Sequence, residues 1–153
     1  MFRDTLVQPA IGDSGLLPDQ LAVVLHGLPR TARNNHVSVD PVRGFLLTTR
    51  GRTIVESNTF HRCAMDAILI TGDAASWFES SPLRDVLIRG NTFIDCGVSI
   101  NPHVQSQNPD EPVHENIRIT GNLFDGAGVS AKSVKGLTVT GNRSPGGAIP
   151  LKI

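Results

Sequence analysis

One phrase recurs along this chain: an alternation of aliphatic and polar residues, then an asparagine, and two residues later a phenylalanine. Clear copies lie at 53–60 (TIVESNTF), 86–93 (VLIRGNTF) and 117–124 (IRITGNLF). An eroded copy covers 137–142 (LTVTGN), and a partial copy at 32–37 extends the series upstream. Repetition of one unit along a chain is the sequence signature of a repeat architecture, so it limits the fold more than any local propensity does.

The asparagines of these copies recur at spacings of 23, 33, 31 and 20 residues. They are Asn35, Asn58, Asn91, Asn122 and Asn142. The shortest spacings define a unit of about twenty residues with two or three short strands, which is one coil of a parallel β-helix. Asparagine suits the turn because it tolerates the left-handed conformation and bonds its own backbone. Phe60, Phe93 and Phe124 should then stack about 4.8 Å apart in an internal column.

The fold class predicted is therefore all-β, a right-handed parallel β-helix of about five coils. A β-sandwich with regularly spaced strands is the alternative, but it does not require the same side chain at the same turn. We expect one domain, with a segment of weak repeat character at 1–33 and the β-helix at 34–153. The last strand runs to the end of the sequence, so we expect a partial solenoid whose uncapped coils allow end-to-end self-association.

Charge and hydropathy give no sign of a nucleic-acid or membrane partner. The chain has 14 basic and 14 acidic residues, so no electrostatic footprint for nucleic acid or an anionic surface is visible. No apolar run is long enough to span a bilayer, and no signal peptide is visible.

Two cysteines occupy one position of the repeat. Cys63 and Cys96 each lie five residues after a ladder asparagine, so they should stack in adjacent coils. They would be either a redox pair or two small buried residues in a column that Ala127 continues, and we favour the second because free cysteine is commonly buried. Their spacing matches no metal site.

The two long spacings contain insertions, at 71–84 and 102–115, that should leave equivalent corners of successive coils and lie on one flank. Solenoids carry binding surfaces on such insertions. The first holds Asp73, Trp77 and Glu79, a combination suited to sugars because pyranose rings stack on indole while hydroxyls need polar partners. Trp77 could equally be a loop anchor over Ile68 and Ile70.

The second insertion holds two histidines, with Asp110 and Glu111 between them. We expect His103 and His114 to be solvated loop histidines rather than metal ligands with Asp110, and no metal is predicted.

A third candidate feature is a polar column. Counting eight residues from each ladder asparagine gives Arg43, Asp66, Ser99 and Ser130. In that register Asp66 lies beside a cation and a hydroxyl, which favour the ionised carboxylate that a nucleophile or general base needs. A stacked surface ion pair is the alternative interpretation.

The segments 44–51 (GFLLTTRG), 63–70 (CAMDAILI) and 77–80 (WFES) resemble the right-handed β-helix exo-α-1,3-galactosidases of glycoside hydrolase family 110. The resemblance covers about residues 34–142 and implies inverting removal of terminal α-linked galactose by carboxylates, with no cofactor. Two features depart from the pattern of that family. Met65 stands where the resemblance implies the first of two adjacent aspartates, and Val42 stands near the place of a further aspartate of the family. By analogy the protein is expected outside the cell or in the periplasm.

Three functional interpretations follow. The first is a glycoside hydrolase acting on an oligo- or polysaccharide, with Asp66 as base or nucleophile and Asp73 or Glu79 as acid. Its substrate would be bound by four residues: Trp77, Arg43, Asn101 and His103. The second is a non-catalytic carbohydrate-binding β-helix, and the third is a structural solenoid segment. A lyase is less favoured because no acidic cluster for calcium is apparent.

Overall fold

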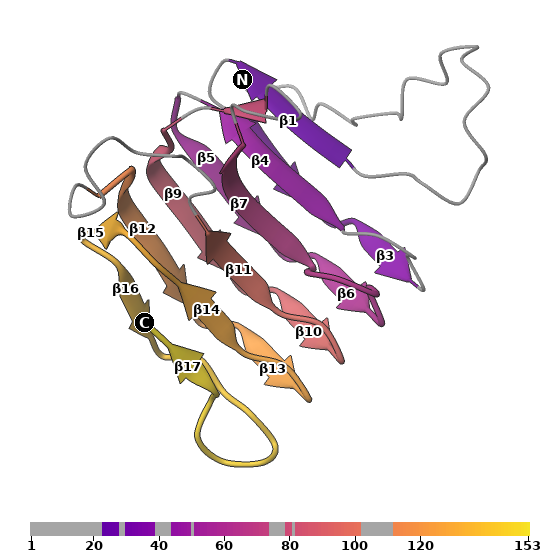
Figure 1. The fold of residues 1–153 in the computed structure, drawn as a ribbon. Coiled ribbons are helices and arrows are strands. Elements are labelled where there is room, and N and C mark those ends of the chain that lie inside the picture. Colours follow the sequence, from indigo (N-terminus) through magenta and orange to yellow (C-terminus); the bar gives the residue numbers. More distant parts are fainter. Residues whose placement is uncertain are drawn as a thin grey trace, which may run out of the picture.

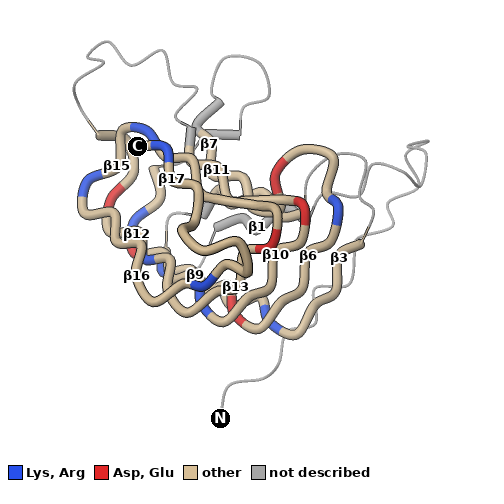
Figure 2. The backbone as a smooth tube through the Cα atoms, turned by 90° about the horizontal axis from the view of Figure 1, so that it is seen from below, with Lys and Arg blue, Asp and Glu red and all other residues tan. Residues whose placement is uncertain are grey.

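The computed structural model describes residues 23–27, 30–38, 44–49, 51–73, 79–80, 82–101 and 112–153. Its regular elements in these ranges are all strands, wound into successive coils whose equivalent strands lie side by side (Figure 1). Viewed from below, the backbone repeats the same course from coil to coil (Figure 2). The predicted parallel β-helix is therefore confirmed.

The strands form three sheets, in which every pairing between coils is parallel. Sheet 1 has the order β1 (Val23–Gly27), β4 (Phe45–Thr49), β7 (Ile68–Asp73), β11 (Val98–Asn101), β14 (Val129–Ala131) and β17 (Leu151–Lys152), with β8 (Glu79–Ser80) antiparallel to β7. Sheet 2 has the order β2 (Arg30–Arg33), β5 (Thr53–Glu56), β9 (Arg84–Arg89), β12 (His114–Thr120) and β15 (Val134–Lys135), and β16 (Thr138–Thr140) also pairs with β12. Sheet 3 has the order β3 (His36–Ser38), β6 (Thr59–His61), β10 (Thr92–Ile94) and β13 (Leu123–Asp125). Because β1 pairs with β4 and β2 with β5, strands within residues 1–33 already belong to the solenoid.

The core is a set of stacked columns between the sheets. Phe60, Phe93 and Phe124 are in register and fully buried, with ring centroids 5.2 and 4.8 Å apart and nearly parallel planes. Phe45 closes this column edge-on, at 5.0 Å and 83° from Phe60. The predicted aromatic column is confirmed, and it fixes the register because a slip of one residue would turn each ring outward.

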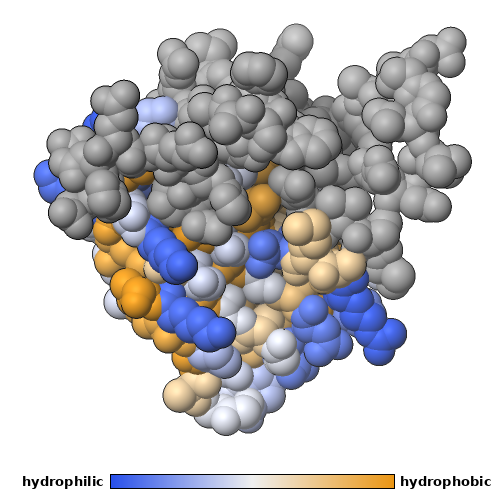
Figure 3. Space-filling model, in the orientation of Figure 1, coloured by the Kyte–Doolittle hydropathy of each residue, from blue (hydrophilic) through white to orange (hydrophobic). Residues whose placement is uncertain are grey.

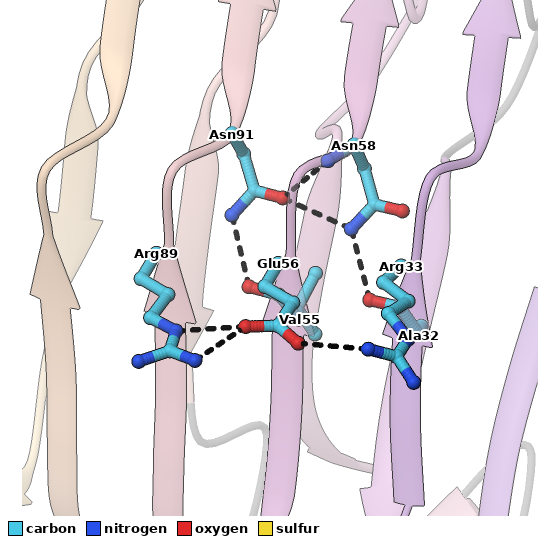
Figure 4. Close-up of polar contacts among 7 residues, drawn as sticks. All are labelled: Ala32, Arg33, Val55, Glu56, Asn58, Arg89 and Asn91. Atoms are coloured by element: carbon cyan, nitrogen blue, oxygen red, sulfur yellow. Dashed lines mark hydrogen bonds and ion pairs between the residues drawn. The ribbon is translucent and has the colours of Figure 1, made fainter. Parts of the chain in front are cut away.

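A hydrogen-bonded asparagine ladder runs along the corner between sheets 2 and 3 (Figure 4). The Oδ1 of Asn91 accepts from the backbone N–H and the side-chain Nδ2 of Asn58, at 3.0 and 2.9 Å. The same pattern joins Asn35 to Asn58, Asn91 to Asn122, and Asn122 to Asn142. Asn58, Asn91 and Asn122 are each 1% exposed, so side-chain amides satisfy the buried backbone where no strand does so.

The expectation that the ladder asparagines adopt the left-handed conformation is wrong. The residue before each of them has the positive φ: Asn34, Ser57, Gly90, Gly121 and Gly141, with φ between 56° and 63°. The left-handed residue turns the chain, and this places the next side chain inside the corner, where its amide can reach the neighbouring coils. Asparagine is therefore needed for its paired donor and acceptor rather than for its backbone freedom.

Candidate functional site

The two insertions leave neighbouring strands of sheet 1. Ile70 of β7 pairs with Ile100 of β11, and Thr71 with Asn101, so both segments start at the carboxyl edge of this sheet, one coil apart. In the first of them, β8 returns antiparallel to β7 and sets Glu79 opposite Asp73. The Cα atoms of such opposed residues lie about 5 Å apart. The fold thus pairs the backbones of two residues that the sequence predicts to be catalytic.

Two rows of register positions follow sheet 1 on its outer face beside these insertions. The first row is Leu46, Leu69, Ser99, Ser130 and Lys152, one from each coil. The next positions along the strands continue the register as Thr48, Thr71, Asn101 and Lys132. The first row therefore changes along the solenoid from aliphatic residues to serine and lysine, and the second row consists of polar residues at the carboxyl edge, where partners for sugar hydroxyls are available.

Thr71 is the most constrained of these polar residues. It is 4% exposed, and its Oγ1 finds no hydrogen-bond partner among the described residues. Its counterpart in the preceding coil, Thr48, is 3% exposed. Since buried hydroxyls are normally hydrogen-bonded, Thr71 is a candidate donor to a bound ligand.

Asp66 lies at the opposite end of β7, and the predicted stacking of Asp66 on Ser99 is wrong, while Arg43, the predicted neighbour in the preceding coil, lies outside the described residues. Ser99 and Ser130 pair with each other, and Leu69, not Asp66, is their neighbour. The count fails because residues 64–66 are an insertion: the first residue of β7 comes ten positions after Asn58, whereas the first residue of β11 comes seven positions after Asn91. Asp66 therefore lies in the corner before β7, half-buried, with its backbone oxygen accepting from Gly44 N–H at 3.1 Å.

The length of β7 separates the predicted carboxylates into two groups. Six extended residues from Ile68 to Asp73 span about 17 Å, and Asp66 lies outside that span. Glycosidase carboxyl pairs lie roughly 5 to 9.5 Å apart. Asp66 lies too far from Asp73 and from Glu79 to act with either of them in the same reaction. The catalytic role of each residue remains a prediction.

Several predicted site residues have limited or no description in the structure. Trp77, Arg43 and His103 lie outside the described residues. Asp73, Glu79 and Asn101 are placed by their backbones alone. Their contribution to substrate binding or catalysis stays a prediction that rests on the sequence.

His114 is not the solvated loop histidine that the sequence led us to expect. It is the first residue of β12 and 0% exposed, and its Nδ1 accepts the backbone N–H of Leu83 at 3.2 Å. Within the described residues its Nε2 has no partner. Burial lowers the pKa of His114 from 6.5 to about 4, so the imidazole is neutral at physiological pH. His114 is therefore a structural residue of the core. The sequence gave no sign of this burial, because His114 is the first residue of its strand.

Sheet 2 carries a charged ladder on its outer face that the sequence analysis missed. Glu56 accepts from Arg89 of the next coil at 2.7 and 2.8 Å, and Arg33 of the preceding coil lies 4.0 Å away (Figure 4). All three precede a ladder asparagine by two residues, so the repeat itself contained the signal. A shallow hollow beside Glu56 and Arg89 extends to Thr120.

A second set of ion pairs follows on the same face. Asp85 is paired with Arg52 at 3.5 Å and with Arg118 at 3.1 Å, and Arg84 with Glu115 at 2.7 Å. Each pair joins different coils and is partly exposed. Such pairs contribute little energy singly, so the ladder mainly specifies register.

The remaining surface features are unspecific. Hydrophilic and hydrophobic residues are interspersed over the described part of the side shown in Figure 3. Over the ranges that the structure describes, no group of three or more acidic, histidine or cysteine side chains is arranged to hold a metal ion. The same ranges contain no helix of the length and hydropathy needed to cross a membrane.

Comparison with known proteins places the chain in a family. The model of the right-handed β-helix region matches residues 22–147. The chain therefore belongs to the right-handed β-helix family.

Its curated relatives are named α-1,3-galactosidases. The α-1,3-galactosidase A of Bacteroides fragilis is 41% identical over 122 residues, which cover 72% of this chain and 20% of that protein. The corresponding protein of Akkermansia muciniphila is 42% identical over 125 residues, 79% of this chain and 20% of that protein. α-1,3-Galactosidase B of Bacteroides thetaiotaomicron is 40% identical over 124 residues. The resemblance inferred from sequence is confirmed, and the chain spans about a fifth of the length of these relatives.

Proposed function

We propose that this chain is a carbohydrate-active β-helix of the glycoside hydrolase type, acting on glycans that end in α-linked galactose. The observation that carries the proposal is the identity of about 40% to proteins named α-1,3-galactosidase, extending over 72–79% of the chain. The outer face of sheet 1 supports it, because a polar row there runs beside the corner from which both insertions leave.

In this proposal the outer face of sheet 1 binds the glycan. Thr71 and Ser99 donate and accept hydrogen bonds with sugar hydroxyls, and Asn101 adds an amide at the carboxyl edge. Trp77 supplies the apolar platform on which a pyranose ring stacks. Arg43 and His103 complete the binding set predicted from the sequence.

Two alternative sets of carboxylates are candidates for catalysing the hydrolysis: Asp73 with Glu79, or Asp66. Asp73 and Glu79, whose backbones pair in the β7–β8 hairpin, would supply the acid and the base that hydrolysis requires. Asp66 alone supplies a base, and an Asp66-dependent reaction needs its acid from elsewhere in the protein. The hairpin assignment therefore requires both Asp73 and Glu79, whereas the Asp66 assignment requires neither.

Hydrolysis of a chromogenic α-galactoside and of an α-1,3-linked galactose disaccharide tests the proposal. Wild type should turn over at least one of them, and loss of the true base or acid should lower kcat by about 100-fold or more. Asp66→Asn and Glu79→Gln distinguish the two assignments. Asp125→Asn is the matched control, since Asp125 is exposed on β13 of sheet 3. Equal turnover in all four proteins would refute both assignments.

A non-catalytic carbohydrate-binding role is the second candidate, favoured by the length of β7 between Asp66 and the other carboxylates. It predicts saturable binding of the galactose disaccharide by titration calorimetry without turnover. Absence of both binding and turnover in folded protein would reject the two candidates together.

A further inference from the structure

The two cysteines occupy one corner position in adjacent coils. The register of β6 and β10 pairs Phe60 with Phe93 and His61 with Ile94, and Arg62 N–H then donates to Ile94 O at 2.9 Å. Continuing by two residues sets Cys63 opposite Cys96. The side chains are 4% and 5% exposed, and both are reduced in the structure.

The two thiols are in direct contact. The Cys63 side chain hydrogen-bonds to Cys96, whose sulfur also receives the backbone N–H of Cys63. The Cys96 thiol in turn lies 3.3 Å from the backbone oxygen of Ile94. The hydrogen bond from the Cys63 side chain is the main reason that the pKa of Cys96 falls from 9.0 to about 7, although burial opposes the shift. The lowered pKa favours the thiolate of Cys96, which is the nucleophilic form.

We propose that Cys63 and Cys96 are a redox-active pair that closes to a disulfide between two coils when a low-molecular-weight disulfide such as oxidised glutathione is present. Strands paired in register lie about 4.8 Å apart, within the roughly 4.4–6.8 Å Cα separation that a disulfide spans. Both thiols are buried, but their corner lies at the surface, because the flanking residues Arg62 and Ala64 are exposed.

The disulfide forms in two steps of thiol–disulfide exchange with oxidised glutathione. The Cys96 thiolate attacks one sulfur of oxidised glutathione, so that a mixed disulfide forms and one glutathione thiolate leaves. Cys63, deprotonated, then attacks the Cys96 sulfur, and the second glutathione leaves as a thiolate. Overall the two protein thiols are oxidised, the glutathione disulfide is reduced to two thiols, and the protons of Cys63 and Cys96 are transferred to the products.

The bond would join the two sides of the corner that carries Asp66. Residues 64–66 follow Cys63 directly, and Ala67 N–H donates to Gly97 O at 2.8 Å across the same two coils. Cys63 directly precedes residues 64–66, and Cys96 directly precedes Gly97. A disulfide between the cysteines would therefore restrain the start of this segment, while the hydrogen bond from Ala67 to Gly97 restrains its end. Oxidation should therefore reduce hydrogen exchange at the amides of residues 64–67 while leaving the amides of β12 and β13 unchanged.

Titration of the native chain with reduced and oxidised glutathione tests the proposal. After acid quenching, unfolding and alkylation, oxidised protein should have lost the mass of two hydrogen atoms and should take up no alkylating agent. The cysteines are 33 residues apart, so closing this loop should raise Tm by about 10 °C, reversed by dithiothreitol. Cys63→Ala should abolish the rise and leave Cys96 with glutathione attached, while alanine itself fits because Ala127 fills the same position in the next coil.

Two results would overturn the proposal. One is alkylation of both cysteines after every native glutathione mixture, with the disulfide appearing only if urea is added first. The other is a disulfide that forms in the native protein without raising Tm or slowing exchange at residues 64–67. Cys96→Ser separates folding from redox chemistry, because it keeps the size of the side chain and should show the Tm of the reduced protein in both buffers.

Discussion

Removing one rung from the middle of the asparagine ladder should destabilise the whole solenoid. Asn91 is 1% exposed and makes four side-chain hydrogen bonds: it accepts two from Asn58, and donates to Val55 O and to Asn122 Oδ1. In Asn91→Ala the four partners lose these bonds inside the corner. At about 1 kcal/mol for each bond, the free energy of unfolding should fall by about 4 kcal/mol.

Urea unfolding followed by far-ultraviolet circular dichroism measures this loss. With a slope of roughly 2 kcal/mol per molar, the midpoint should move down by about 2 M. Asn35→Ala is the matched control, because Asn35 is exposed and water can replace its two side-chain bonds, to Arg33 O and Asn58 Oδ1. Its cost should be about 1 kcal/mol or less. Equal shifts for both variants would refute the view that buried amide pairing, rather than asparagine as such, stabilises the corners.

Three further perturbations have distinct outcomes. Phe93→Ala, which empties the middle of the aromatic column, should cost about 3–5 kcal/mol in the same urea assay, and a cost under 1 kcal/mol would contradict the stacking. Gly97→Ala should prevent or strongly weaken folding because its Cβ would overlap the backbone oxygen of Gly128, and wild-type stability in that variant would show that the coil spacing is wrong. His114 has a lowered folded pKa, so the unfolded chain binds more protons, and stability should fall as pH drops below 6.5 toward 4, by up to about 3 kcal/mol. Thermal unfolding against pH checks this, and His114→Gln should remove that part of the pH dependence; an unchanged profile in the variant would exclude His114 as its source.

The repeated phrase was enough to predict the fold, because each element of it has one physical task. The asparagine pairs with its copies, and the phenylalanine stacks on its copies, so identical residues at identical positions imply coils in register. The position of the left-handed residue was mispredicted because asparagine tolerates that conformation, while its amide pairing depends on neighbours that are distant in the sequence.

The candidate site was only partly predictable. The spacing of Asn58 and Asn91 contains both a large insertion and the three-residue insertion at 64–66, and an ungapped count cannot separate them. Asp66 was therefore assigned the wrong neighbour in the following coil, Ser99, whereas Thr71, whose signal is burial without a partner among the described residues, was missed entirely. Insertions at corners change register without disturbing the columns, so composition and spacing do not reveal them.

The most direct test of the proposed function is to locate the surface on which a galactose-terminated glycan binds. Amide chemical shifts should be recorded while the α-1,3-linked galactose disaccharide is titrated into the protein. The account predicts saturable shifts on the outer face of sheet 1, centred on Thr71, Ser99 and Asn101. Shifts confined to the hollow of sheet 2 at Glu56 and Arg89 would contradict it, and so would the absence of any shift at saturating sugar.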